Sequence, residues 1–447
     1  MRNGSVRTAR ARPSRYGLLA AVLVPALAAL NLVMVPAAQA DDIHDREYWL
    51  ADYGITKAWE TTKGAGVKVA VIDSGVDASH QDLKDAVVGG TDVSGAGSAD
   101  GRQGLGAKPE HGTLVASLLA GRGHGGAPTD SPKPDGVVGV APEASLLTVS
   151  TWLGSPNPAG KSTNDQIPAA VRWAVDNGAK VINMSLTSSS PSWPQSWDDA
   201  FLYAEQHDVV MVAAAGNSES GISQVGAPAT IPGVVAVAGL NRDGQVSTSA
   251  STQGITIAVA APAEKLVGAL PGNNYADWSG SSGAAPIVSG VAALIRAKYP
   301  TMPAAQVINR IIRTAKPAGG AVPNSQYGWG ILDAAAALSA DVAPVTVSPL
   351  PSLQEWITIH RRGTQSTSAT DPSATPSAPA TPTAPVAGPT VPAAIAPVQT
   401  ASAVPALVVL GFGGLLLLVC AAGTWQVLRL RRRLASGETV TEKPRNT

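Results

Sequence analysis

Four polar residues in this sequence are of the types that acyl transfer requires, and each follows or begins an apolar stretch. In chain order they are Asp73 after VKVAVI, His111 at the start of HGTLVASLLAG, Asn217 after VVMVAAAG, and Ser282 in GSSGAAP. A serine hydroxyl becomes a nucleophile when a neutral imidazole accepts its proton, and a carboxylate fixes the tautomer of that imidazole. The Asn217 side chain and the Ser282 backbone N–H could hydrogen-bond the oxyanion. The four residues therefore indicate a candidate acyl-transfer site.

Taken one at a time, these residues also have purely structural explanations. A carboxylate before Ser-Gly, as in Asp73-Ser74-Gly75, is common in turns, and so is an amide such as Asn217. A serine at a helix start, such as Ser282, is most often an N-cap, and His111 could be an ordinary surface residue. Catalysis is favoured only if the fold brings the four side chains to one place.

The elements around these residues predict such a fold. Apolar, β-branched runs at residues 67–72, 144–150, 180–186, 208–215 and 233–240 alternate with helical stretches at 112–120, 165–177, 196–206 and 284–298. Near-continuous apolar strands alternating with helices indicate an α/β fold with a mainly parallel sheet that is covered on both faces. Ligands bind beyond the carboxyl ends of the strands in such sheets. The candidate residues are therefore expected at that edge.

Five blocks of sequence resemble the successive signature blocks of the subtilisin-like serine proteases of the S8 type. They are AVIDSGVD, HGTLVASLLAG, VINMSL, AAAGN and GSSGAAPIVSGVAAL, and the resemblance extends from Gly54 to Ala337. The order Asp, His, Ser is that of subtilisin. The resemblance implies a three-layer subtilisin-like fold and a serine endopeptidase that hydrolyses peptide bonds through an acyl-enzyme. It makes Asp73, His111 and Ser282 the triad and Asn217 the oxyanion donor.

The same resemblance assigns roles around the nucleophile. Ser185, Leu186 and Thr187 match the strand that lines the specificity pocket and pairs with an extended substrate. Gly280 and Gly283 are expected to keep the surroundings of Ser282 open. Pro286 is expected in the first turn of the helix, where its missing N–H costs little. The chain departs from the family in having Ser281 where threonine is usual, and Gly283 where a bulkier residue is frequent.

No cofactor or metal is predicted. The loops at residues 92–110 and 122–135 contain four aspartates, but these lack a recognisable calcium-ligand spacing, so we interpret them as solvated loop acids. They are Asp92, Asp100, Asp130 and Asp135.

Charge and cysteine content exclude some other classes of protein. The 447 residues have a formal net charge of zero, with 14% charged and 45% hydrophobic residues. This balance provides no electrostatic field for nucleic acid, so no nucleic-acid partner is expected. The single cysteine, Cys420, cannot form a disulfide within the chain, and its apolar surroundings indicate a small buried hydrophobic residue.

The N-terminus has the composition of a secretory signal. Residues 1–15 contain arginines and no acid, an apolar run follows, and Ala38-Gln39-Ala40 precedes Asp41. We interpret residues 1–40 as a signal peptide cleaved after Ala40, with an uncleaved membrane anchor as the alternative.

Residues 41–66 are predicted to form an N-terminal strap. Subtilisin-type domains usually have a longer inhibitory prodomain, whereas this segment is short and rich in large side chains. These are Tyr48, Trp49, Leu50, Tyr53, Ile55 and Trp59. Such residues favour a segment that packs permanently against the protease domain, residues 67–343. The alternative is a short propeptide that is removed on maturation.

The C-terminal part of the sequence predicts a membrane anchor. Residues 344–400 read as a Pro-rich linker, a stalk that cannot bury a core. Residues 401–428 contain no charge and are long enough for one transmembrane helix. Arginines begin the tail, residues 429–447, which places it in the cytoplasm. The expected location is the cell membrane, with a single span and an extracellular protease domain.

This order of segments is similar to that of the mycosins, the membrane-anchored proteases of type VII secretion systems. The resemblance implies a protein or peptide substrate and a type VII secretion membrane complex as a partner. Mycosins generally contain disulfides, which this chain cannot form internally. The alternative function is a scaffold that stabilises a secretion complex, with proteolysis secondary.

Overall fold

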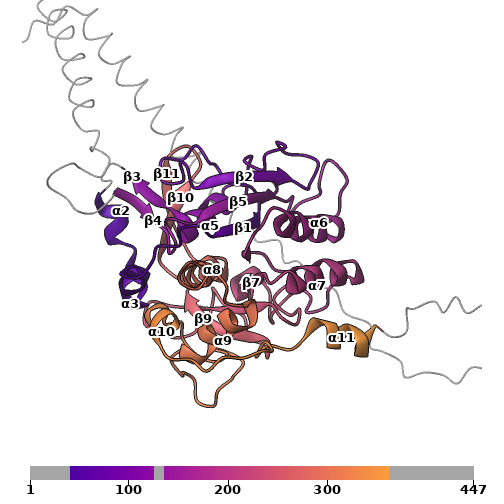
Figure 1. The fold of residues 1–447 in the computed structure, drawn as a ribbon. Helices are drawn as coiled ribbons and strands as arrows, with labels where there is room; N and C mark the ends of the chain where they lie inside the picture. Colours follow the sequence, from indigo (N-terminus) through magenta and orange to yellow (C-terminus); the bar gives the residue numbers. More distant parts are fainter. Residues whose placement is uncertain (1–40, 125–134, 362–447) are drawn as a thin grey trace, which may run out of the picture. The chain divides into compact units, whose positions relative to one another are not determined.

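A seven-stranded sheet in which every pair of neighbouring strands is parallel forms the centre of the fold (Figure 1). The computed structural model describes residues 41–124 and 135–361. In spatial order the strands are β2 (Val87–Asp92), β5 (Ser145–Ser150), β1 (Lys68–Asp73), β6 (Val181–Met184), β7 (Val210–Ala214), β8 (Val235–Leu240) and β9 (Ile257–Pro262). The inner strands are almost wholly buried, as expected for a sheet covered on both faces.

Helices cover both faces of this sheet. On one face α5 (His111–Ala120) packs against α8 (Ser281–Lys298), and on the other α6 (Thr163–Asp176) lies beside α7 (Asp198–Gln206) (Figure 1). Two later helices, α9 (Ala304–Thr314) and α10 (Ala334–Ser339), pack with α8. The expected α/β fold with a mainly parallel sheet in three layers is therefore confirmed.

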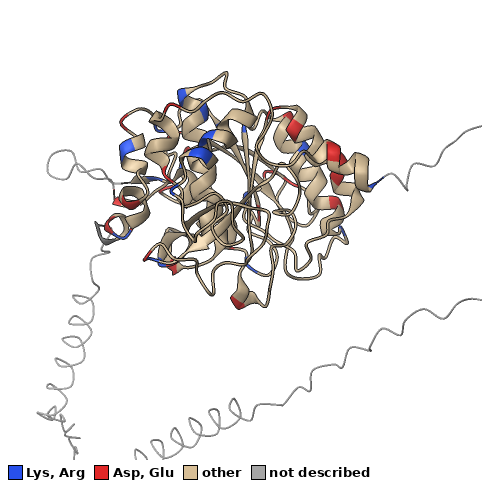
Figure 2. Ribbon diagram, turned by 90° about the horizontal axis from the view of Figure 1, so that it is seen from below, with Lys and Arg blue, Asp and Glu red and all other residues tan. Residues whose placement is uncertain are grey.

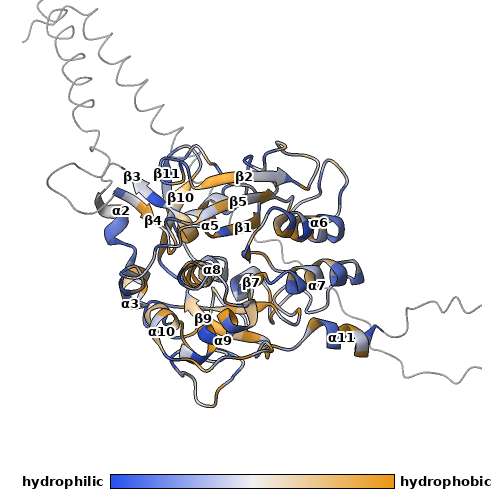
Figure 3. Ribbon diagram, in the orientation of Figure 1, coloured by the Kyte–Doolittle hydropathy of each residue, from blue (hydrophilic) through white to orange (hydrophobic). Residues whose placement is uncertain are grey.

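The distribution of side chains explains this layering. Charged residues lie on the outer helices and the loops, and few occur on the central strands (Figure 2). Helices α6 and α7 carry both hydrophilic and hydrophobic residues, as expected for helices with one buried face (Figure 3). Helix α8 differs because nearly all its residues are buried between the sheet and the other helices.

Several elements were not predicted from the sequence. Strand β2 reads VVGGTD and contains two glycines, and β9 ends in a proline, so neither resembles a typical strand. Two antiparallel hairpins, β3 (Arg122–His124) with β4 (Asp135–Val138) and β10 (Leu266–Leu270) with β11 (Asn274–Trp278), lie outside the main sheet. Two short 3₁₀ helices are η1 (Gln195–Trp197) and η2 (Ser218–Ser220).

The described part of the N-terminal strap consists of three short helices that pack on the protease domain. These are α2 (Asp41–Asp45), α3 (Tyr48–Asp52) and α4 (Ile55–Ala58). Trp49 and Ile55 are completely buried, and the indole N–H of Trp59 donates to the Val140 carbonyl at 2.8 Å. The large side chains of the strap thus pack against the protease domain. That the strap is retained on maturation stays a prediction.

The C-terminal end of the described chain differs from the sequence prediction. Helix α11 (Leu353–His360) lies within the range 344–400 that was assigned to a Pro-rich linker, and it packs against α7. The linker prediction is therefore wrong for residues 344–361, because Leu353 is buried in the core and Ile357 packs against it, contacts that a stalk lacks.

The predicted signal peptide (1–40), the rest of the linker (362–400), the membrane span (401–428) and the tail (429–447) lie outside the described residues. Within residues 41–124 and 135–361, no helix is both long and apolar enough to cross a membrane.

One strap contact involves a buried carboxylate. Glu47 is 4% exposed, and its carboxylate accepts hydrogen bonds from the Val138 backbone N–H at 3.0 Å and from the His44 Nδ1 at 2.7 Å. Burial raises the pKa of Glu47 from an ordinary value of 4.5 to about 7, against the opposing effect of the bonds from His44 and Val138. The strap therefore docks through a group that is protonated at mildly acidic pH.

Protonation of Glu47 makes the stability of the domain pH-dependent. The folded chain keeps this proton up to about pH 7, whereas the unfolded chain releases it near pH 4.5. Between these values the free energy of unfolding should fall as the pH rises, by up to about 3 kcal/mol from this group. We expect Glu47→Gln to reduce this slope in thermal melts from pH 4.5 to 8, with Glu60→Gln, at an exposed carboxylate, as the control. An unchanged slope in Glu47→Gln would contradict the assignment.

Candidate active site

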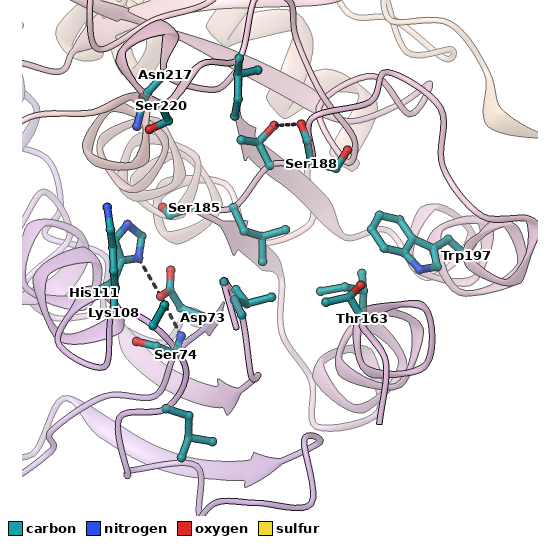
Figure 4. A pocket seen from close by; sticks show the side chains of 18 residues that line it. Asp73, Ser74, Lys108, His111, Thr163, Ser185, Ser188, Trp197, Asn217 and Ser220 are labelled. Atoms are coloured by element: carbon teal, nitrogen blue, oxygen red, sulfur yellow. Dashed lines mark hydrogen bonds and ion pairs between the residues drawn. The ribbon is translucent and has the colours of Figure 1, made fainter. Parts of the chain in front are cut away.

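A carboxylate–imidazole pair lies where β1 ends and α5 begins. The Nδ1 of His111 is 2.8 Å from Oδ1 of Asp73 (Figure 4). The same oxygen accepts the Ser74 backbone N–H at 2.7 Å, and the Asp73 side chain is only 2% exposed. With Nδ1 protonated and donating to Asp73, the Nε2 of His111 is the free acceptor, which is the tautomer a general base needs.

Ser74 holds the start of α5 against the end of β1. Its hydroxyl accepts the Gly112 backbone N–H at 2.9 Å and donates to the Pro109 carbonyl at 3.3 Å. Because Ser74 adjoins Asp73 and Gly112 adjoins His111, this bridge fixes the distance between carboxylate and imidazole. The sequence predicts Ser74 only as a turn residue, and its position directly after Asp73 is the one local signal for this role.

Several groups act on the pKa of His111. Burial lowers it, but the Asp73 carboxylate opposes burial through its charge and its hydrogen bond, and the net effect is a raised pKa. Smaller effects come from the Lys108 ammonium, which lowers the pKa, and from the Glu110 carboxylate, which raises it.

Ser282 is the second residue of α8 and exchanges two hydrogen bonds with Ser185, which follows β6. The Ser282 hydroxyl donates to the Ser185 carbonyl at 3.1 Å, and the Ser185 hydroxyl donates to the Ser282 carbonyl at 2.7 Å. Pro286 lies in the second turn of α8, not in the first as expected, because the helix begins at Ser281. Pro286 has no N–H for the Ser282 carbonyl, and the Ser185 hydroxyl takes its place.

The Asn217 side chain is oriented by Ser281. Its Oδ1 accepts both the backbone N–H of Ser281, at 2.8 Å, and the Ser281 hydroxyl, at 3.0 Å. The Ser281 hydroxyl is completely buried and accepts the Gly216 backbone N–H at 3.0 Å. With Oδ1 occupied in this way, the Nδ2 donor of Asn217 and the Ser282 backbone N–H have no acceptor in the described part of the chain. Both are therefore available to an oxyanion.

The glycines around Ser282 act differently from one another. Gly280 has a φ of 151°, which disfavours other residues, and a Cβ there would lie 3.1 Å from Asn217 Nδ2. At Gly283 a Cβ would lie 2.2 Å from a methyl carbon of Leu266. The expectation that Gly283 keeps the site open is therefore wrong, since the absent side chain lets Leu266 pack closely.

A cavity of about 540 Å³ extends from the carboxylate–imidazole pair to α6 and to Trp197 in η1. Its lining includes the predicted substrate residues Ser185, Leu186 and Thr187, together with Asn217. Figure 4 shows His111 and Asp73 at one end, Asn217 above the Ser185 segment, and Trp197 with Thr163 at the other end. Lys108, which the sequence analysis did not single out, also lines this cavity.

Six of the seven predicted site residues thus line one cavity at the carboxyl ends of β1, β6 and β7, and the seventh, Ser282, is hydrogen-bonded to Ser185 in the cavity wall. The exception to the expected geometry is the Ser282 hydroxyl, which is bonded to Ser185 and not to His111. A rotation about the Cα–Cβ bond of Ser282 would redirect the hydroxyl, and such catalytic hydrogen bonds often form only with substrate bound. Within residues 41–124 and 135–361, no group of three His, Cys, Asp or Glu side chains is arranged to hold a metal ion.

Comparison with known proteins identifies this arrangement. The model of the subtilase family, peptidase S8, matches residues 64–330, which is more than half of the chain and includes all seven site residues. The chain belongs to the subtilase family. It is accordingly a subtilisin-like serine protease, and the predicted resemblance is confirmed.

Relatives of two kinds are found. Subtilisin DY of Bacillus licheniformis is 39% identical over 281 residues, which cover 62% of this chain and 92% of the relative. Mycosin-4 of Mycobacterium tuberculosis is 37% identical over 353 residues, which cover 69% of this chain and 72% of the relative. The crystal structure of MycP1 from the ESX-1 type VII secretion system has a TM-score of 0.55 and 30% identity, and the match covers 66% of this chain and 86% of that one. This subtilase is therefore related to the mycosins.

The free Nδ2 of Asn217 leads to a prediction about turnover. We expect Asn217→Ala to lower kcat about 10²–10³-fold with little change in KM, because an oxyanion donor acts mainly in the transition state. Ser281→Ala should lower kcat about tenfold, since it removes the bond that orients the Asn217 amide. Ser281→Thr, which keeps the hydroxyl, is the matched control.

The two losses should not multiply in the double variant Asn217→Ala/Ser281→Ala, because Ser281 acts through Asn217. Steady-state kinetics with a peptide substrate measure all four variants. Wild-type turnover in Asn217→Ala would contradict this assignment.

The charges near His111 lead to a prediction about pH. If neutral His111 is the base, kcat/KM should fall on acidification with a midpoint above the ordinary histidine value of about 6.5. Lys108→Met should move this midpoint up and Glu110→Gln should move it down, since the lysine lowers and the glutamate raises the pKa of His111. Rate profiles at low ionic strength measure the shifts, and 1 M salt should reduce them. Shifts of the opposite sign, or a flat profile from pH 5 to 9, would exclude His111 as the titrating group.

Proposed function

We propose that this subtilase is a membrane-anchored extracellular serine endopeptidase that serves a type VII secretion system. The observation that carries the catalytic part is the His111 imidazole, which is bonded to a buried carboxylate beside a cavity that Asn217 also lines, the Asn217 Nδ2 having no acceptor among the described residues. Side chains of these types in one cavity are those that acyl transfer uses.

The proposed reaction begins when His111 accepts the proton of the Ser282 hydroxyl through Nε2. The Ser282 oxygen attacks the peptide carbonyl, and Asp73 stabilises the imidazolium that results. The oxyanion accepts hydrogen bonds from the Asn217 Nδ2 and the Ser282 backbone N–H. The imidazolium then protonates the leaving amine, which gives an acyl-enzyme, and water hydrolyses the acyl-enzyme with His111 again as base.

The substrate is proposed to be a protein or peptide in extended conformation. Ser185, Leu186 and Thr187 leave the carboxyl end of β6 and border the cavity, so their backbone can pair with a peptide strand.

The membrane and secretion parts of the proposal have separate support. The uncharged sequence 401–428 followed by arginines supports a single span with a cytoplasmic tail. The similarity to mycosin-4 and to MycP1 of the ESX-1 system supports the link to type VII secretion.

The catalytic proposal is tested by labelling with a fluorophosphonate, which reacts with activated serines. We expect the full-length protein to be labelled, and Ser282→Ala to be unlabelled although folded by circular dichroism. Ser192→Ala, at an exposed loop serine, is the control and should be labelled like the wild type. Labelling of Ser282→Ala at the wild-type rate would exclude Ser282 as the nucleophile.

The same label locates the protein in cells. The full chain should sediment with membranes, whereas a chain ending at Arg361 should be released as a labelled soluble protein. A soluble full-length chain would contradict the anchor. If Ser282→Ala still restored secretion in cells that lack the chain, the scaffold alternative would be favoured over proteolysis.

A further inference from the structure

The C-terminal helix α11 is attached to the wall of the substrate cavity, although it lies beyond the residues matched by the family. It packs beside α7 (Figure 1), and Trp197, the residue that directly precedes α7, lines that cavity. Arg361, the residue after α11, precedes a sequence whose frequent prolines begin at Pro372. Helix α11 is held at both ends, by a buried leucine at its start and by an ion pair just after its last residue.

The N-terminal end of α11 is anchored by a buried leucine. Leu353 is fully buried in the hydrophobic core. The Ser352 side chain caps the helix by accepting the Glu355 backbone N–H at 3.3 Å. This end is therefore part of the packed core and not a loose extension.

The C-terminal end is anchored by a group that we call the clasp, which consists of Trp193, Asp198, Trp356 and Arg361. The Arg361 guanidinium donates to both carboxylate oxygens of Asp198, at 2.8 and 3.4 Å, and to the Trp193 carbonyl at 3.3 Å. The Trp193 indole N–H donates to the same carboxylate at 2.7 Å, and the Trp193 and Trp356 rings lie 4.4 Å apart. Since the Asp198 side chain is 5% exposed, loss of Arg361 would leave a buried carboxylate without its cation.

The clasp adjoins the apolar end of the cavity through Trp197. Asp198 follows Trp197 directly, and Trp197 stacks on Phe201 of α7 with ring centroids 5.9 Å apart. Trp197 lies with Thr163 at the end of the cavity away from His111 (Figure 4), and Ile167 and Leu186 also line the cavity. The buried indole N–H of Trp197 has no hydrogen-bond partner among the described residues, so packing alone holds its ring.

We propose that Arg361 is a positioning residue for substrate selection, acting through Asp198 on the Trp197 wall of the cavity. With the clasp closed, Trp197, Ile167 and Leu186 form an apolar recess for a bulky aliphatic or aromatic side chain of the substrate. When the contact between Arg361 and Asp198 is broken, Asp198 no longer holds the adjacent Trp197 in place, and the recess loses its shape. The inference deepens the proposed endopeptidase function and rests on it. If the inference is correct, the segment that follows Arg361 and leads to the proposed anchor starts next to the Trp197 wall of the cavity.

The test compares full-length wild type, Arg361→Ala and Gln354→Ala, the last altering an exposed side chain of α11 outside the clasp. The substrates are internally quenched peptides that carry Leu or Ala at each of four positions before the cut. The wild type identifies the position at which Leu raises kcat/KM most. At that position we expect Arg361→Ala to reduce the Leu-to-Ala ratio about tenfold, mainly through KM, while Gln354→Ala keeps the wild-type ratio.

A purely structural effect of Arg361 would lower kcat/KM for the Leu and Ala peptides by the same factor, and that result would overturn the proposal. If Arg361→Ala does not fold, Arg361→Lys decides, because lysine keeps the charge but loses the two-point contact. It should reduce the same ratio by a smaller factor, and an unchanged ratio would overturn the proposal. A wild-type protein that cleaves peptides with no preference between Leu and Ala refutes the recess alone. A wild-type protein that cleaves none refutes the proposed function as well.

Discussion

The geometry of the site depends on the pair of hydrogen bonds between Ser185 and Ser282. They connect the loop after β6 to the first turn of α8, the helix that packs against β6, β7, β8 and β9. Pro286 creates the need for this contact, because it leaves the Ser282 carbonyl without a helical partner in a partly buried position, where an unpaired carbonyl is costly. The contact continues inward, since Asn183 donates to the Ser185 hydroxyl and accepts from Ser289. A buried polar chain thus fixes where α8 begins relative to the sheet edge.

The other half of the site is fixed by a buried carboxylate. Asp73 is almost inaccessible to water, and its Oδ1 is satisfied by the His111 ring and the Ser74 backbone N–H. A charge with little solvent access needs such partners, and the imidazole needs the charge to hold its tautomer, so each group stabilises the arrangement of the other. The parallel sheet brings these groups together, because the carboxyl ends of β1, β6 and β7 lie at the same edge.

Both ends of the described chain are packed against this core although the chain cannot form an internal disulfide. The N-terminal strap buries Trp49 and Ile55, and the C-terminal helix α11 buries Leu353. The same physical means, apolar burial with a few buried polar bonds, attaches both segments. They differ in what they contact, since the strap lies against β4 and α10, whereas α11 lies beside the wall of the substrate cavity.

The sequence alone determined the fold class, because near-continuous apolar strands such as β7 and β8 leave little alternative to a parallel sheet covered by helices. It also predicted which residues gather at the sheet edge, since Asp73 and Asn217 follow strands and His111 and Ser282 open helices. It missed β2 and β9, whose glycines, alanines and proline carry no strand signal, and it assigned α11 to a linker. Only the tertiary structure decided the roles of Ser74, Ser281 and Arg361. Each acts through a hydrogen bond to a residue distant in the chain, and although Ser74 directly follows Asp73, no local pattern of residue types specifies the distant partner.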